Sequence, residues 1–209
     1  YSYIFHFVTA LGMVTLFMFV DFNTISPGAN DNLTGTYAAV CALRMLDMAG
    51  VDFENTEVCA MITDGEEAGL RGCKSWAKNH YDEYVNSGVE TVVLCVDTLT
   101  DREYLRVYNK DMTGTVKNNQ QFSQLVMDAS KDAGHDDIEL SSVFFGSSDA
   151  AAFSQAGITA TCLAAMDPRP ADYYHNRRDT ADRLVPETIK TGFDVIISTI
   201  LNFDEKGLN

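Results

Sequence analysis

The chain of 209 residues is long enough for about one domain with a sizeable core, and 46% of its residues are hydrophobic. The formal net charge of −15 excludes a general role in binding nucleic acids, because such a surface repels phosphate backbones and no basic patch offsets it. This charge favours cations as partners, either metal ions or the amino group of a substrate.

Residues 1–20 contain no Asp, Glu, Lys or Arg and carry aromatic residues near both ends. Such a run predicts a transmembrane helix, with a buried strand over residues 14–20 as the alternative. No Lys or Arg follows before Arg44, which favours a membrane-anchored or extracytoplasmic position for the rest of the chain. The predicted organisation is therefore an apolar membrane segment over residues 1–20 and one folded domain over residues 21–209.

A loop of small and turn-forming residues at positions 26–32 precedes a predicted helix over residues 33–48. The helical pattern is apolar on nearly every side, which indicates packing between other elements. Asp31 stands near the end of the loop, where its simplest role is to cap the helix. Asp31 could instead hold a ligand at the helix start if later segments supply further ligands.

Residues 56–63, TEVCAMIT, form a short apolar run that predicts a buried strand. After a turn, Glu66 and Glu67 open a second predicted helix over residues 66–81. The helix dipole stabilises acidic residues in a first helical turn, so this pair has an explanation that requires no catalytic role. A catalytic role is nevertheless open to one of the two.

The strand predicted over residues 91–96 also ends at an acid, Asp97. Strand-like runs then alternate with helical patterns up to a final amphipathic helix that Pro186 starts. The elements between are a short strand at 104–108, a helix at 120–133, a strand at 143–145, a helix at 150–157 and a strand at 158–164. This alternation indicates a layered α/β fold with a largely parallel sheet.

Several candidate site residues follow predicted strands, among them Glu67, Asp97, Asp149 and His175. In such folds, sites form at the carboxyl ends of the strands, so we expect these side chains to converge. A divalent metal that polarises a carbonyl needs hard oxygen or imidazole ligands. Asp31, Glu67 and His175 would supply three, and Asp97 could help Asp31 to hold a second metal.

Adjacent side chains point in different directions, so Glu66 and Glu67 cannot do the same work. One of them can bind a metal while the other takes a proton from water. The sequence thus offers both a set of ligands and a nearby base.

Five segments resemble, in order and spacing, the signature segments of the di-zinc aminopeptidases, a family that includes bacterial leucyl aminopeptidases and aminopeptidase Y. They are SPGANDNLTG, ITDGEEAGLRG, VDTLTD, GSSDAAAFSQAGI and YYHNRRDTADRL. The resemblance runs from about Pro27 to the final helix. It implies a three-layer α/β/α fold with a mixed, largely parallel central sheet, with the option that N-terminal strands of the family lie outside this chain.

The resemblance also implies an activity. The expected enzyme is a metal-dependent exopeptidase with one or two Zn²⁺ ions per chain. It would hydrolyse the N-terminal bond of a peptide with a free N-terminus through a metal-activated water. Asp31 would bridge the metals, Glu67 and His175 would complete one site, Asp97 would serve the other, and Glu66 would be the general base.

Two further acids, Asp149 and Asp179, resemble the family's carboxylates that orient metal ligands from behind. The family's usual His after the Ser-Asp pair is Ala150 here, so no role of that side chain transfers to this chain.

The family carries a His-x-Asp motif upstream of the bridging Asp, and this chain has no His there. Asp21 and Asn23 are the nearest counterparts. The interpretation that we favour places the true motif before Tyr1, separated from the bridging loop by the apolar segment.

Two other functions remain open from the sequence. A single-zinc cyclase acting on N-terminal glutamine needs only Asp31, Glu67 and His175. A non-catalytic ectodomain that kept the fold would explain the missing histidine. The presence of Glu66 and Asp97 argues against the non-catalytic ectodomain, because a decayed site has little reason to keep them.

Overall fold

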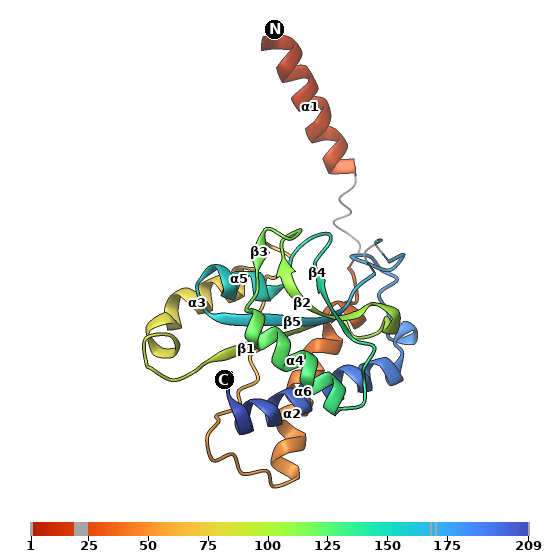
Figure 1. The fold of residues 1–209 in the computed structure, drawn as a ribbon. Helices are drawn as coiled ribbons and strands as arrows, with labels where there is room; N and C mark the ends of the chain where they lie inside the picture. The colour runs from red at the N-terminus through yellow and green to blue at the C-terminus, as the bar shows by residue number, and fades with distance from the viewer. Residues whose placement is uncertain (1, 19–24, 168, 170, 209) are drawn as a thin grey trace.

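Residues 2–18, 25–167, 169 and 171–208 are described by a computed structural model of the chain (Figure 1). The helices are α1 (Ser2–Met18), α2 (Gly35–Met48), α3 (Arg71–Tyr84), α4 (Gln120–Asp132), α5 (Asp149–Gln155) and α6 (Pro186–Lys206). The strands are β1 (Val92–Asp97), β2 (Leu105–Asp111), β3 (Val116–Lys117), β4 (Glu139–Ser142) and β5 (Thr159–Ala165). Short turns of other helical types are η1 (Ala29–Thr34), η2 (Arg102–Tyr104) and η3 (Ala181–Arg183).

The strands form one mixed sheet in the order β1-β5-β2-β3, and β4 also pairs with β2. The pairs β1–β5 and β2–β4 are parallel, whereas β2 is antiparallel to both β5 and β3. The predicted α/β class with a mixed central sheet is confirmed.

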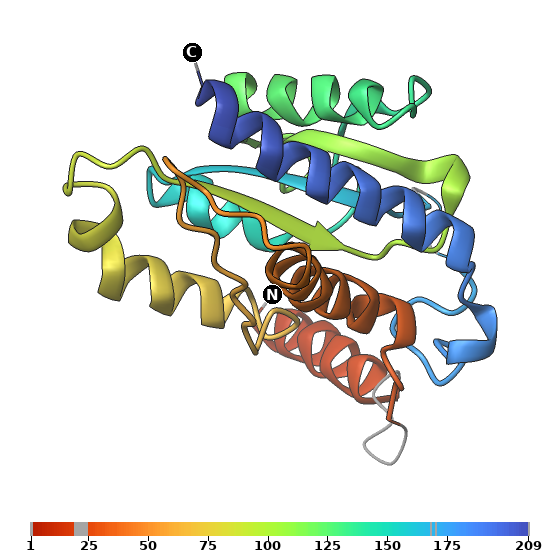
Figure 2. The same ribbon diagram turned by 90° about the horizontal axis from the view of Figure 1, so that it is seen from below.

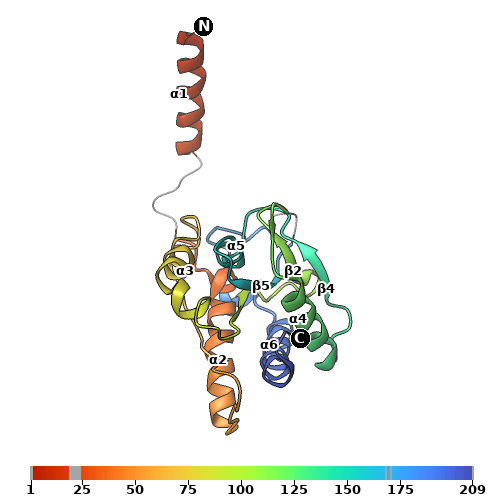
Figure 3. The ribbon, with the colours of Figure 1, turned by 60° about the vertical axis from the view of Figure 1, so that its left-hand side comes forward.

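Helices cover both faces of the sheet, because side chains of β5 alternate between two buried cores. Leu163 and Ala165 belong to the core formed with α2, α4 and α6, whereas Cys162 and Ala164 belong to the core formed with α3 and α5. Helices α4 and α6 lie side by side over one face (Figure 2), and α3 and α5 lie on the opposite side (Figure 3). This is the expected three-layer arrangement.

The strand predicted over residues 56–63 is wrong. Its residues are half-buried or exposed, and it pairs with no strand in the described residues. The edge of β1 that faces away from β5 is instead occupied near its end by Asn32. The Asn32 side-chain amide donates to the Val96 carbonyl at 2.9 Å and accepts from the Thr98 N–H at 3.2 Å. An apolar run becomes a strand only where a partner strand is available.

Two other predicted elements are shifted. The helix expected from residue 66 begins at Arg71, because turns at residues 66–70 precede it and Gly65 and Gly69 take positive φ values of 63° and 95°. The strand expected at 143–145 lies earlier in the chain, where the more polar residues Glu139–Ser142 form β4. Phe144 and Phe145 follow the end of that strand and are exposed.

The predicted transmembrane helix over residues 1–20 is not supported. Within the described part of the chain, no helix has both the length and the apolar character needed to cross a bilayer. The boundary predicted between residues 20 and 21, together with Asp21 and Asn23, lies outside the described residues.

Candidate metal centre

The loop that carries Asp31 is held by a network of hydrogen bonds. The Asp179 carboxylate accepts from the backbone N–H groups of Asn30 and Asp31, at 2.8 and 2.9 Å. The side chain of Asn30 is buried, and its Oδ1 accepts from the N–H groups of Leu99 and Thr100, at 2.9 and 3.1 Å. The peptide bond from Asp31 to Asn32 is cis. The position of Asp31 is therefore fixed from the end of β1 and from the loop before α6.

Glu66 and Glu67 lie on a tight loop rather than in a helix. Backbone bonds close this loop, from Leu70 N–H to the Glu66 carbonyl at 2.7 Å and from Gly72 N–H to the Asp64 carbonyl at 3.1 Å. A Cβ at Gly72 would stand only 2.3 Å from the Asp64 carbonyl oxygen, so this close approach requires glycine. The start of α3 thereby sets where the two acids lie.

The structure brings three of the predicted ligands together. Nε2 of His175 lies 3.3 Å from Oδ2 of Asp31 and 3.1 Å from Oε1 of Glu67. One candidate ligand atom from each residue lies within 4.8 Å of those of the other two. The ring of Tyr174 stacks on the His175 imidazole with their centroids 3.7 Å apart, which helps to fix the ring's direction.

Asp97 lies at the end of β1, outside that group of three. Its Oδ1 atom is buried and has no hydrogen-bond partner among the described residues. Burial, followed by the negative charges of Asp31 and Glu66, raises its pKa well above the usual range. Buried carboxyl oxygens are normally hydrogen-bonded, and one that no hydrogen-bond donor reaches is typical of a residue that binds a metal ion.

Asp149, the first residue of α5, contacts the segment that precedes Glu66 and Glu67. Its Oδ2 accepts from the Thr63 hydroxyl at 3.1 Å, and its Oδ1 is buried without a hydrogen-bond partner in the described ranges. The turn before it is held by the buried Asp111, which accepts from the N–H and hydroxyl of Ser148 at 3.0 and 2.6 Å. Asp149 therefore approaches the segment that leads to Glu66. Its role as an orienting carboxylate stays a prediction, and so does that of Asp179, which binds backbone groups.

Several carboxylates lie close together at this centre, and their charges repel one another. Burial raises the pKa of Glu66 to about 7, with further contributions from the charges of Glu67, Asp149 and Asp31. Hydrogen bonds to Asp31 and Glu67 raise the pKa of His175 to about 10. A divalent cation would relieve the repulsion among the acids and would lower the pKa of Glu66. Three converging oxygen and nitrogen donors, beside a buried carboxyl oxygen that no described residue pairs, fit zinc.

Sequence reasoning missed two contributors to this centre. Tyr174 stacks on the His175 ring, and the spacing of the ligands does not predict this contact. Asn30 looked like an ordinary turn residue, whereas it binds the backbone after β1 and donates to the Tyr173 hydroxyl at 3.1 Å. A polar residue between Ala29 and Asp31 gives no sequence signal for such burial.

The sequence model of peptidase family M28 matches residues 14–200. The chain belongs to peptidase family M28. Aminopeptidase YwaD of Bacillus subtilis (strain 168), a curated relative, is 27% identical over 194 residues, which are 84% of this chain and 37% of that protein. The family assignment agrees with the resemblance of the five segments.

Solved structures show the same fold as this M28 chain. An aminopeptidase from Aneurinibacillus sp. strain AM-1 has a TM-score of 0.70 at 22% identity, and the match covers 84% of this chain and 39% of that one. BSAP, a zinc aminopeptidase from Bacillus subtilis, has a TM-score of 0.63 at 22% identity, with coverages of 84% and 42%. The chain thus spans less than half the length of these relatives.

Proposed function

We propose that this chain forms the metal-binding and proton-transferring part of a zinc aminopeptidase. The observation that supports this proposal is the convergence of Asp31, Glu67 and His175 at one point, with Glu66 beside them. The names of the M28 relatives agree with this activity. The curated relative is an aminopeptidase, so the single-zinc cyclase alternative is not favoured.

In this proposal Asp31, Glu67 and His175 hold a zinc ion, and Asp97 adds a ligand for a second. Zinc supplies Lewis acidity when bound, which polarises a carbonyl and lowers the pKa of water. Glu66 takes the proton from the attacking water and returns it to the leaving amine. The surrounding acids attract the free ammonium group of the substrate and hold it near the scissile bond.

The test of this function compares leucyl-4-nitroanilide with its N-acetylated form, using the zinc-loaded chain. We expect hydrolysis of the free amine only, loss of hydrolysis after removal of zinc with EDTA, and recovery when zinc is returned. Equal hydrolysis of the acetylated substrate would exclude an aminopeptidase. If zinc binds and neither substrate is hydrolysed, the non-catalytic alternative is supported. Elemental analysis adds the number of zinc ions per chain.

We also propose a membrane-anchored or extracytoplasmic position for this domain, with residues 1–20 as the contact to lipid. The absence of charged residues in that segment and the exposure of the side chains at positions 2–15 support it. We expect the chain to sediment with phosphatidylcholine vesicles and the Leu11→Asp variant to do so far less. Equal sedimentation of the two chains, or none of either, would refute the contact of residues 1–20 with lipid.

A further inference from the structure

A cavity of about 210 Å³ opens beside Asp97, on the face of the sheet that α5 covers. It runs across the strands, from the end of β1 past β5 toward β2 and β4. Its walls combine aromatic and apolar side chains with hydroxyl groups and charged groups. The side chains that matter below are Asp97, Arg106, Tyr108, Phe145, Met166 and Asp167.

The register of the sheet places Asp97 and Arg106 in one row. Asp97 of β1 pairs with Ala164 of β5, and Ala164 pairs with Arg106 of β2. Residues that pair across neighbouring strands point to the same face of a sheet, so all three lie on the α5 side. The Cα atoms of Asp97 and Arg106 are therefore about 10 Å apart, two strand spacings. Ala164 is small and leaves the space between them open.

Arg106 places a positively charged guanidinium group at this cavity. Its Nη1 donates to the Leu105 carbonyl at 2.8 Å, and its Nε lies 3.9 Å from a carboxylate oxygen of Glu139. The Glu139 side chain is 74% exposed, so this long ion pair is weak. The other acid at that end, Asp167, accepts from the backbone N–H of Arg169 at 2.8 Å and lies 3.4 Å from its Nε.

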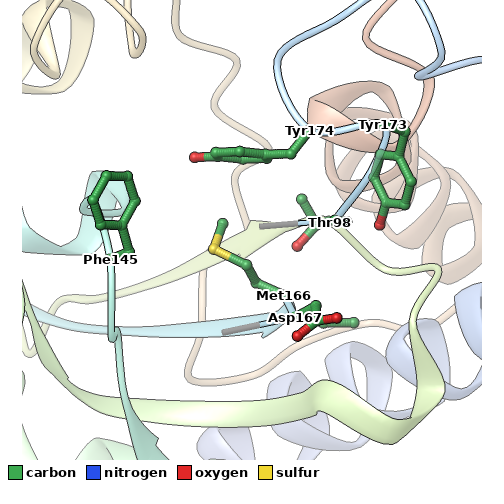
Figure 4. Close-up of a pocket in the computed structure, with 8 residues that line it drawn as sticks. Thr98, Phe145, Met166, Asp167, Tyr173 and Tyr174 are labelled. Atoms are coloured by element: carbon green, nitrogen blue, oxygen red, sulfur yellow. The ribbon is translucent and has the colours of Figure 1, made fainter. Parts of the chain in front are cut away.

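Phe145 and Met166 form an apolar part of the cavity wall. Phe145 and Met166 line both this cavity and a smaller one of about 20 Å³ beneath Tyr174. Figure 4 shows the Met166 side chain pointing toward the space between Phe145 and Tyr174. An aliphatic stem would pack against this wall while a terminal charged group reached the guanidinium.

We propose that this cavity receives the side chain of the N-terminal residue of the substrate, and that Arg106 selects an acidic one. The inference rests on the proposed function, because it places the scissile bond beside Asp97. A glutamyl side chain spans part of the distance between Asp97 and Arg106, and the flexible Arg106 side chain covers the rest. A guanidinium binds a carboxylate through two parallel hydrogen bonds, whereas a lysyl side chain would be repelled.

The test compares the kcat/KM values of glutamyl-, norleucyl- and lysyl-4-nitroanilide. Norleucine is the uncharged control, because it has the four-carbon stem of lysine without the ammonium group. We expect the wild type to prefer the glutamyl substrate. Arg106→Met should lower kcat/KM for it roughly tenfold and raise that for the norleucyl substrate, and Arg106→Lys should retain most of the preference. The control Arg44→Met removes an exposed arginine from α2 and should change nothing. A uniform effect of Arg106→Met on all three substrates would overturn the inference.

A binding measurement keeps this inference separate from the proposed function. Calorimetry of free L-glutamate and L-norleucine with the zinc-loaded chain requires no turnover. If no anilide is hydrolysed, the proposed function fails. Arg106 is then judged by L-glutamate alone: binding roughly tenfold weaker in Arg106→Met supports the inference, and equal or undetectable binding by both proteins refutes it. Melting temperatures confirm that each variant is folded.

Discussion

Replacing Glu66 with Gln is expected to lower kcat about 10³-fold and to leave the zinc content unchanged. Glutamine has the same size as glutamate and fits the same loop, but its amide cannot accept a proton from water. Glu66 is half-buried and lies close enough to Glu67, Asp149 and Asp31 for their charges to raise its pKa. In the proposed mechanism it is the acid that moves the proton.

The measurement combines steady-state hydrolysis of leucyl-4-nitroanilide with elemental analysis of the same samples. The matched control is Glu205→Gln, which makes the same chemical change at an exposed position on α6. That variant should keep the wild-type rate. If Glu66→Gln retained half or more of the wild-type kcat, another group would have to be the base.

Replacing His175 with Ala is expected to weaken zinc binding at least 100-fold and to abolish hydrolysis. The imidazole is one of three converging donors, and it is the only nitrogen among them. Without it, Asp31 and Glu67 remain as two carboxylates with no imidazole between them. A site reduced to two ligands holds zinc poorly.

Zinc affinity is measured by competition with a chromophoric chelator, and the rise in melting temperature on adding zinc serves as a second readout. His80→Ala is the control, because that imidazole pairs with exposed Glu83 on α3 at 2.9 Å, away from the centre. Zinc should raise the melting temperature of the control as it does for the wild type. An undiminished rise in His175→Ala would remove His175 from the ligand set.

The layered fold was largely predictable, because several segments have strong local signals. Residues 159–165, TATCLAA, are small or apolar, and both faces of this strand are buried. The last helix begins at Pro186, which is favoured at a first helical position. Such elements depend mainly on their own sequence.

Other elements depend on neighbours that no local pattern reveals. Residues 56–63 have the composition of a strand, but pairing requires a second strand at the right place. Phe144 and Phe145 suggested a buried strand, yet both are exposed and help to line the cavity beside Asp97. Burial of an apolar pair is decided by the shape of the whole sheet.

The candidate centre shows the same division. Asp31, Glu67 and His175 lie in three separate signature segments, and the order and spacing of those segments predicted that the three side chains meet. The surroundings were not predictable in this way. Asn30 contacts residues about 70 positions later in the chain. Arg106 lies in the same row as Asp97 only because of the pairing of β1, β5 and β2.

The central claim, that Asp31, Glu67 and His175 share a metal ion, is tested most directly by X-ray diffraction from crystals of the zinc-loaded chain. Anomalous scattering at the zinc absorption edge locates the ion independently of any assumed role. We predict a peak within bonding distance of all three side chains. A crystal with zinc bound elsewhere, or with no zinc peak between these residues at saturating metal, would contradict the account.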